Sequence, residues 1–175
     1  MNGANPLRVT DKLEDALSSF SPDSSKLVFS TYRWGDRRNR IYYVWTDEQN
    51  RRAWEWGAGG LFGEDPDWMA DGQIAYHTGG QTAQLWLMSG DATNQRAFFS
   101  VAAPDTIGAI SAAPNSGTVA YMRSSGGNWD IYTVNTDGSN PRRLTDDPAN
   151  DGLPAWSPDG QSIAFVSDRS GQWAL

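Results

Sequence analysis

Residues able to perform covalent or acid–base chemistry are few in this sequence. His77 is the only histidine and there are no cysteines, so thiolate nucleophiles and the usual zinc ligand sets are excluded. No G-x-S-x-G segment occurs, and a Ser-His-Asp triad would require His77, which we expect to be an ordinary residue at a strand end. A P-loop and a dinucleotide-binding G-x-G-x-x-G are also missing. The sequence therefore predicts a protein that is not an enzyme, with no catalytic residue, no cofactor and no metal site.

Carboxylates are more prominent and recur at regular intervals. They fall in segments expected to connect one sheet to the next, and the candidates are Asp65, Asp67, Asp105, Asp147 and Asp151. If these connections open on one face, they form an acidic rim suited to a basic peptide or a cationic ligand. The alternative is that aspartate simply caps turns and solubilises loops.

A long basic segment, residues 33–40, offers a second candidate contact element. It carries Trp34 together with Arg33, Asp36 and Arg37, and Trp and Arg are enriched at binding hot spots. The alternative is a surface loop folded on itself. With the carboxylates above, these residues define one candidate partner-contact face.

The overall charge limits the choice of partner. Lys and Arg number 14 and Asp and Glu 21, a net charge of −7, which disfavours binding to nucleic acid or to anionic membranes. No apolar run approaches the roughly 20 residues of a membrane span, and the N-terminus lacks the apolar core of a signal peptide. We expect a protein or peptide partner, preferably a basic one, with no nucleic acid and no membrane insertion.

The elements that position these residues are internal repeats. Equivalent turn positions recur every 44 to 48 residues, at Pro22, Ala70, Pro114 and Pro158. A segment that begins with asparagine recurs every 44 to 46 residues, at Asn5, Asn50, Asn94 and Asn140. A period near 40–45 residues with four strands per repeat is typical of propeller blades.

Each repeat contains a strand that is apolar at every position. Examples are Leu27-Val28-Phe29, Ile74-Ala75-Tyr76, Val119-Ala120-Tyr121 and Ile163-Ala164-Phe165-Val166. In an antiparallel sheet with one face exposed to water, apolar and polar residues would alternate along each strand. These strands are apolar throughout, so both of their faces must be covered. The sequence predicts an all-β propeller domain spanning residues 1–175, with four-stranded antiparallel blades. The predicted blades are 18–56, 67–100, 109–145, and a closing blade from 155–175 plus 5–10 of the same or a partner chain.

Two segments, LTDDPANDGLPAWSPDGQSIAFVSDRSG and DIYTVNTDGSNPRRLT, closely resemble the repeats of TolB-like propellers. The resemblance is strongest over residues 128–173 and extends more weakly over the rest of the chain. It implies a binding scaffold that works through protein–protein contact, often in the bacterial envelope, so a periplasmic or extracellular location. Similar repeats form the gating propellers of prolyl-oligopeptidase-like and tricorn-like proteases, which is the alternative function.

The two ends of the chain look complementary, because the first residues align with a fourth strand and the last residues with the strands before it. Three arrangements remain open: one chain closing as four blades, two chains closing as an eight-bladed ring, or part of a longer propeller. The sequence favours the homodimer, since an unclosed ring exposes sheet faces and strand edges.

Overall fold

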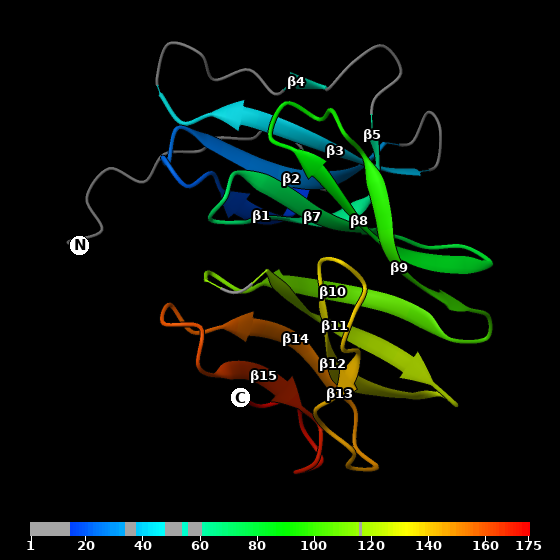
Figure 1. The fold of residues 1–175 in the computed structure, drawn as a ribbon. Helices are drawn as coiled ribbons and strands as arrows, with labels where there is room; N and C mark the ends of the chain where they lie inside the picture. The colour runs from blue at the N-terminus through cyan, green and yellow to red at the C-terminus, as the bar shows by residue number, and fades with distance from the viewer. Residues whose placement is uncertain (1–14, 34–37, 48–53, 56–60, 116) are drawn as a thin grey trace.

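The structure is a computed structural model, and it describes residues 15–33, 38–47, 54–55, 61–115 and 117–175. Over these ranges the chain consists of β-strands joined by turns, arranged as four antiparallel sheets (Figure 1). The prediction of an all-β chain with antiparallel sheets is confirmed, and the second and third sheets have the four strands that were predicted. Within the described ranges, no helix is long and apolar enough to cross a membrane.

Strands that follow one another in the chain pair side by side in each sheet. The first sheet contains β1 (Asp15–Phe20), β2 (Lys26–Arg33), β3 (Arg38–Trp45) and β4 (Trp54–Glu55), with β5 (Leu61–Phe62) also paired to β3. The second contains β6 (Glu64–Trp68), β7 (Gln73–Thr78), β8 (Thr82–Ser89) and β9 (Arg96–Ala102). The third contains β10 (Thr106–Ala112), β11 (Thr118–Ser125), β12 (Asn128–Asn135) and β13 (Arg142–Arg143). The fourth has two strands, β14 (Asp151–Trp156) and β15 (Ile163–Ser167).

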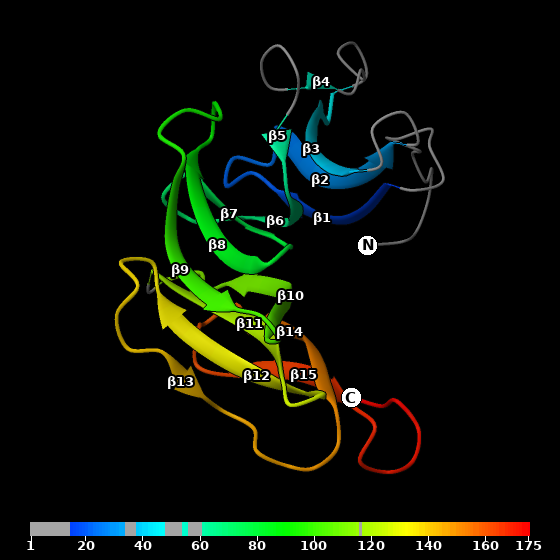
Figure 2. The same ribbon diagram turned by 90° about the vertical axis from the view of Figure 1, so that its right-hand side faces the viewer.

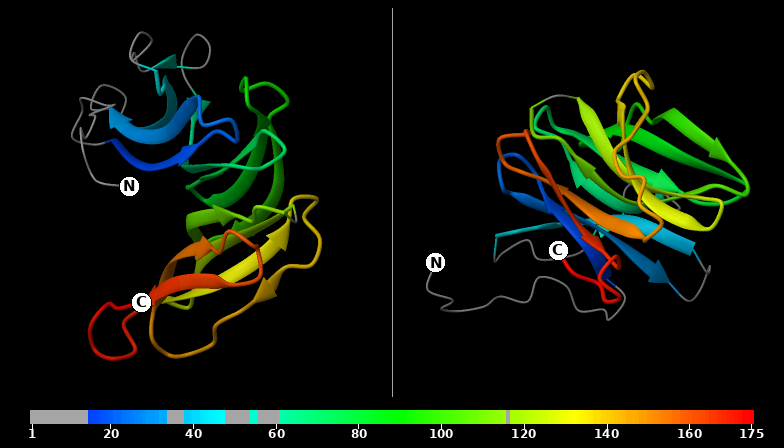
Figure 3. Two further views of the ribbon diagram at one scale, coloured as in Figure 1. Left: turned by 90° about the vertical axis from the view of Figure 1, so that its left-hand side faces the viewer. Right: turned by 90° about the horizontal axis from the view of Figure 1, so that it is seen from below.

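The four sheets follow one another around an arc. Their first strands, β1, β6, β10 and β14, line its inner side (Figure 2), and each contacts the next in that order. The later strands β9 and β13 lie on the outer side. Figure 3 shows the same succession from the opposite side, with the first and fourth sheets at the two ends of the arc. This is the blade arrangement of a propeller, and the way the ring closes stays a prediction.

The second strand of each of the first three sheets is buried on both faces, as its apolar sequence requires. Val28, Ile74 and Val119 are fully buried, and the aromatic residues Phe29 and Tyr76 are at most 2% exposed. Burying one such side chain stabilises the fold by about 1.5–3 kcal/mol. These strands are therefore the centre of the hydrophobic core.

The fourth sheet departs from the prediction. Ile163 and Phe165 are only partly buried and Ala164 is exposed, so the expectation that this run is covered on both faces is wrong here. The physical reason is that, among the described residues, the fourth sheet is the last of the arc and has a neighbouring sheet on one face only (Figure 2). In addition, β15 has no third strand beside it beyond a single bridge between Ser167 and Ala174.

The turns use the chemistry that their sequences predict. In the Ser-Pro-Asp-Gly turn, Gly160 N donates to Ser157 O at 2.8 Å, and the carboxylate of Asp159 accepts hydrogen bonds from the Ser157 hydroxyl and Gln161 N. These bonds hold the pKa of Asp159 below its ordinary value.

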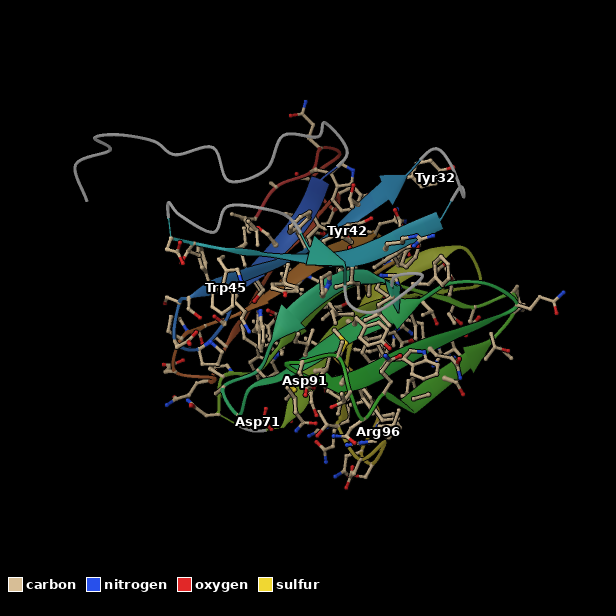
Figure 4. The ribbon with its side chains drawn as sticks, turned by 90° about the horizontal axis from the view of Figure 1, so that it is seen from above. Tyr32, Tyr42, Trp45, Asp71, Asp91 and Arg96 are labelled. Atoms are coloured by element: carbon tan, nitrogen blue, oxygen red, sulfur yellow. The ribbon has the colours of Figure 1, made fainter. Side chains whose placement is uncertain are left out.

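The second sheet repeats this device at two turns. Asp71 accepts a hydrogen bond from Gln73 N and Asp91 from Thr93 N, and Figure 4 shows both aspartates at the same end of the sheet. Both are Asx turns, in which a carboxylate satisfies a backbone donor two residues ahead.

Contact between neighbouring sheets leads to a stability prediction at Gly138. This residue has a φ of 83°, and a Cβ added to it would lie 2.4 Å from the carbonyl oxygen of Phe98 in β9. Gly72 has the same φ of 83° but nothing within 4 Å of an added Cβ. We expect Gly138→Ala to lower the free energy of unfolding by about 1–3 kcal/mol more than Gly72→Ala, because only the former also forces the two sheets apart. Urea denaturation of both variants measures the difference, and equal losses would contradict it.

Candidate functional site

A hollow of about 220 Å³ lies on the inner side of the arc, where the first strands of all four sheets meet. We call it the axial hollow, and it is lined by Ser18, Ser19, Asp65, Pro66, Asp67, Ala109, Ile110, Ser111 and Pro154. The structure thus brings together two of the candidate residues, Asp65 and Asp67. The serines were not identified from the sequence, although Ser19 and Ser111 occupy the same repeat position as Asp67 and could have been found by that spacing.

A β-bulge in every inner strand shapes this hollow. Strand pairing shifts register between Ala16 and Ser19, Glu64 and Asp67, Gly108 and Ile110, and Gly152 and Ala155. At the bulges of the second and fourth sheets, Asp65 and Leu153 have a left-handed backbone with a φ of 51°. A bulge adds a residue, bends the strand and re-aims the neighbouring side chains. The repeated bulges are therefore what turns residues of the inner strands toward the arc axis.

Asp67 connects two sheets. Its carboxylate accepts a hydrogen bond from Ala112 N of the next sheet at 2.7 Å. Burial raises the pKa of Asp67, and hydrogen bonds from Ser19, Ala112 and Trp68 only partly oppose this effect. The carboxyl group is therefore more easily protonated than an exposed aspartate.

The same link occurs on both sides of Asp67. Trp68 N donates to the Ser19 hydroxyl at 3.1 Å and Trp156 N donates to the Ser111 hydroxyl at 3.2 Å. In each of the first three inner strands, the side chain of the second-last residue thus accepts a hydrogen bond from a backbone N–H of the next inner strand. We call this series the inner ladder. In the fourth sheet the equivalent residue is Ala155, which has no side-chain acceptor.

Asp65 is held by the single histidine. His77 Nε2 lies 3.0 Å from Asp65 Oδ2, and both side chains are largely buried, at 5% and 13% exposed. His77 lies one residue before the end of β7, near the strand end as the sequence suggested, and it is in addition a buried partner of Asp65. Its Nδ1 has no hydrogen-bond partner. In the described part of the chain, no group of three or more His, Asp or Glu residues could hold a metal ion.

The remaining carboxylates do not form the exposed rim that we expected. Asp105 pairs with Arg123, at 3.0 Å from Nε, and the carboxylate of Asp147 accepts a hydrogen bond from Ala149 N at 2.9 Å. Asp65, Asp67 and Asp151 lie within β6 and β14 and not in loops. The sequence could not show this, because the loop between sheets is shorter than the repeat alignment implied. Their role in partner contact stays a prediction.

Asp151 shows how a buried carboxylate is accommodated. It is fully buried and accepts two hydrogen bonds from Arg169 Nη2, at 2.9 and 3.0 Å. Burial raises its pKa, but hydrogen bonds from Ser167, Arg169 and Thr145 outweigh this effect, so the pKa of Asp151 is below its ordinary value. A charge held in this way is part of the fold and is not available to a ligand.

The basic segment lies largely outside the described residues. This holds for Trp34, Asp36 and Arg37, while Arg33 is the last residue of β2 and its side chain is not described. The prediction that this segment contacts a partner is therefore unchanged.

Comparison with known proteins identifies the family. The family model described as the TolB beta propeller domain matches residues 65–174, more than half of the chain. The chain belongs to the TolB β-propeller family. The resemblance inferred from the repeats is thereby confirmed.

Relatives include both TolB proteins and a peptidase. The chain is 40% identical over 53 residues to the Tol-Pal system protein TolB of Desulfosudis oleivorans, covering 30% of this chain and 12% of that protein. It is 44% identical over 46 residues to dipeptidyl-peptidase 5 of Porphyromonas gingivalis, covering 26% of this chain and 7% of that protein. The chain thus spans a small part of the length of these relatives.

A solved structure shows the same fold. TolB from Acinetobacter baumannii matches with a TM-score of 0.77 at 18% sequence identity, over 98% of this chain and 42% of that chain. At this identity the match shows the fold alone, and it agrees with the blade arrangement described above.

The raised pKa of Asp67 leads to a prediction about stability. A carboxyl group whose pKa is raised by folding stabilises the fold below its ordinary pKa of 3.8, and this contribution is lost as the pH rises through the folded-state value. We expect Asp67→Asn to have a higher free energy of unfolding than the wild type at pH 7, with the difference shrinking below pH 3.8. Urea denaturation at both pH values tests this, with the turn variant Asp71→Asn as control. A difference that is independent of pH would contradict it.

Proposed function

We propose that this chain is a non-catalytic binding module that holds a basic side chain of a protein or peptide partner in the axial hollow. The observation that carries the proposal is the convergence of Asp65 and Asp67 with three serine hydroxyls in one hollow. Carboxylates and hydroxyls accept hydrogen bonds from a lysine ammonium or an arginine guanidinium, and charge-assisted bonds are the stronger ones. The net charge of −7 favours the approach of a basic partner.

Specific features of the hollow support binding over catalysis. His77 is buried against Asp65, and among the described residues no serine hydroxyl is hydrogen-bonded to it. A serine nucleophile needs a base within hydrogen-bond reach. The two carboxylates are instead held in place as hydrogen-bond acceptors: His77 positions Asp65, and the inner ladder positions Asp67.

Short peptides test the proposal. We expect an alanine-rich octapeptide with a central lysine or arginine to bind in isothermal titration calorimetry, while the same peptide with a central glutamine does not. Asp65→Asn combined with Asp67→Asn should weaken binding by about tenfold or more, since charged hydrogen bonds contribute about 1.5–3 kcal/mol each. The matched control, Asp71→Asn combined with Asp91→Asn, also removes two negative charges, at exposed turns, and should retain binding. If the glutamine peptide bound as tightly as the lysine and arginine peptides, the proposal would be contradicted.

The peptidase relative favours a second candidate function, the gating propeller of a larger peptidase. In that case the axial hollow would lie on the path of a peptide substrate, and the chemistry would belong to another domain. A hydrolase domain encoded next to this sequence would favour this alternative, and its absence would favour the binding module.

We also propose, as the sequence favours, that two copies close the ring by strand complementation, with residues 5–10 of one copy completing the closing blade formed by residues 155–175 of the other. Light scattering on a size-exclusion column should then give a mass near twice 19.2 kDa. Ring closure buries two open sheet faces, which explains why it should be favourable. A stable, monodisperse monomer would contradict the dimer and leave the binding proposal unaffected.

A further inference from the structure

A second hollow, of about 500 Å³, lies between the first and second sheets. It is at the end of the first sheet opposite Trp45, where Tyr32 contributes to its lining (Figure 4). Its volume is within the range of about 300–1,000 Å³ that is usual for small-molecule sites. We call it the side hollow. It shares no lining residue with the axial hollow, and the two sheets that form it are consecutive in the chain.

The floor of the side hollow is backbone pressed against the core. Gly63 is the buried residue of the lining, and a Cβ added to it would lie 2.6 Å from Cδ2 of Tyr76 and 2.9 Å from Cδ1 of Ile41. A larger residue would therefore push the two sheets apart. Gly63 N also donates to the carbonyl oxygen of Asn39 at 3.2 Å. Contacts that belong to the fold thus hold this floor in place.

Polar side chains of the lining are available to a ligand. Among the described residues, the Asn39 amide and the Glu64 carboxylate have no hydrogen-bond or ion-pair partner, although both residues are half-buried. Thr78 adds a hydroxyl, whose Oγ1 accepts a hydrogen bond from Trp86 Nε1 at 3.2 Å, so its O–H can donate in another direction. Together an amide, a carboxylate and a hydroxyl offer both donors and acceptors. A ligand with several hydroxyl groups would satisfy them.

Aromatic rings and open backbone complete the lining. Tyr32 is half-buried and Phe62 is 39% exposed. The guanidinium carbon of Arg40 lies 4.9 Å from the centroid of the Phe62 ring, a contact that orients this ring. At Gly79 and Gly80 an added Cβ would meet nothing within 4 Å. One wall of the side hollow is therefore bare backbone that a ligand can approach closely.

The charges at the side hollow decide the class of ligand. Glu64 supplies the only carboxylate of the described lining, and the guanidinium of Arg40 stands beside Phe62. Because these two charges are opposite, neither a cation nor an anion is favoured overall. The aromatic rings offer an apolar surface, and the polar groups offer hydrogen bonds. A sugar ring matches this combination, because it has apolar C–H faces and a rim of hydroxyl groups.

We infer that the side hollow binds a neutral sugar. One face of the sugar ring packs against Tyr32 and Phe62, and its hydroxyls form hydrogen bonds with Asn39, Glu64 and Thr78. The inference goes beyond the proposed function and does not depend on it, because the axial hollow is lined by other residues. It is also independent of ring closure, since both sheets that form the side hollow belong to one chain.

Neutral disaccharides test the inference. We expect cellobiose or N,N′-diacetylchitobiose to bind the 175-residue chain saturably in an NMR titration and to shift the backbone amide signals of Gly79 and Gly80. The matched control is the turn between β11 and β12, where Gly126 and Gly127 have equally open surroundings. Their signals should not move. Absence of binding by both sugars, or shifts confined to other parts of the chain, would overturn the inference.

Charged analogues test the class of ligand. The deacetylated form of N,N′-diacetylchitobiose is a cation, and cellobiuronic acid is the anionic analogue of cellobiose. Neither should bind more tightly than its neutral counterpart, because Glu64 and Arg40 offset each other. Tighter binding of either charged analogue would show that the side hollow selects a charge and would contradict a neutral sugar as its ligand.

Substitutions locate the bound sugar. Phe62→Ala should weaken binding about fivefold to tenfold through loss of the aromatic surface, and Asn39→Ala about fivefold through loss of a hydrogen bond. The matched controls Phe20→Ala and Asn115→Ala remove an exposed aromatic ring and an exposed amide outside the side hollow, and they should bind normally.

Circular dichroism checks that each variant is folded, and Asn39→Ala decides the test if Phe62→Ala is not. Unchanged binding by Asn39→Ala would overturn the inference. The variant with Asp65→Asn and Asp67→Asn should bind the sugar as the wild type does, so failure of the sugar test and failure of the basic-peptide test are distinguishable.

Discussion

The structure depends on one constraint: the second strand of each sheet is apolar on both faces, so it must be covered by neighbouring sheets. The buried clusters show how this is met. Val28 and Ile41 of the first sheet pack with Ile74 and Tyr76 of the second, and the second and third sheets share two further clusters. Each of these three clusters draws side chains from two sheets, whereas the first sheet also has a buried cluster of its own, Leu27, Phe29, Tyr42 and Val44. Successive sheets must therefore stack.

Stacking alone would leave the inner strands loosely connected, since a bulge interrupts each of them. The inner ladder supplies the missing link, with Ser19, Asp67 and Ser111 each accepting a backbone N–H from the next sheet. Asp67 has a double role in this picture, because the carboxylate that joins two sheets also lines the axial hollow. Placing a carboxylate at this position costs desolvation, which is seen in its raised pKa. The serines at the equivalent positions make the same link without a charge.

The net negative charge of the chain does not by itself show where a partner binds, because many of its carboxylates are already paired within the fold. Asp151 and Asp130 are buried and paired with Arg169 and Arg143, and the aspartates of the turns bond to their own backbone. Such carboxylates are already satisfied by the fold. Asp65 and Asp67 instead line the axial hollow on the inner side of the arc, which is where we propose that a basic side chain binds.

The sequence by itself determined the repeat, the strand pattern, the turn chemistry and the family, because each depends on local spacing and residue type. Ser157-Pro158-Asp159-Gly160, for example, specifies its turn without help from the rest of the chain. Only the tertiary structure decided that Asp65 and Asp67 lie side by side with serines from other repeats, and that His77 is a buried partner of Asp65. Only it decided that Ile163 and Phe165 are no more than partly buried among the described residues, although their pattern matches the buried strands. The physical reason is that burial and side-chain direction depend on which strands lie alongside and where bulges turn them, and sequence spacing carries neither.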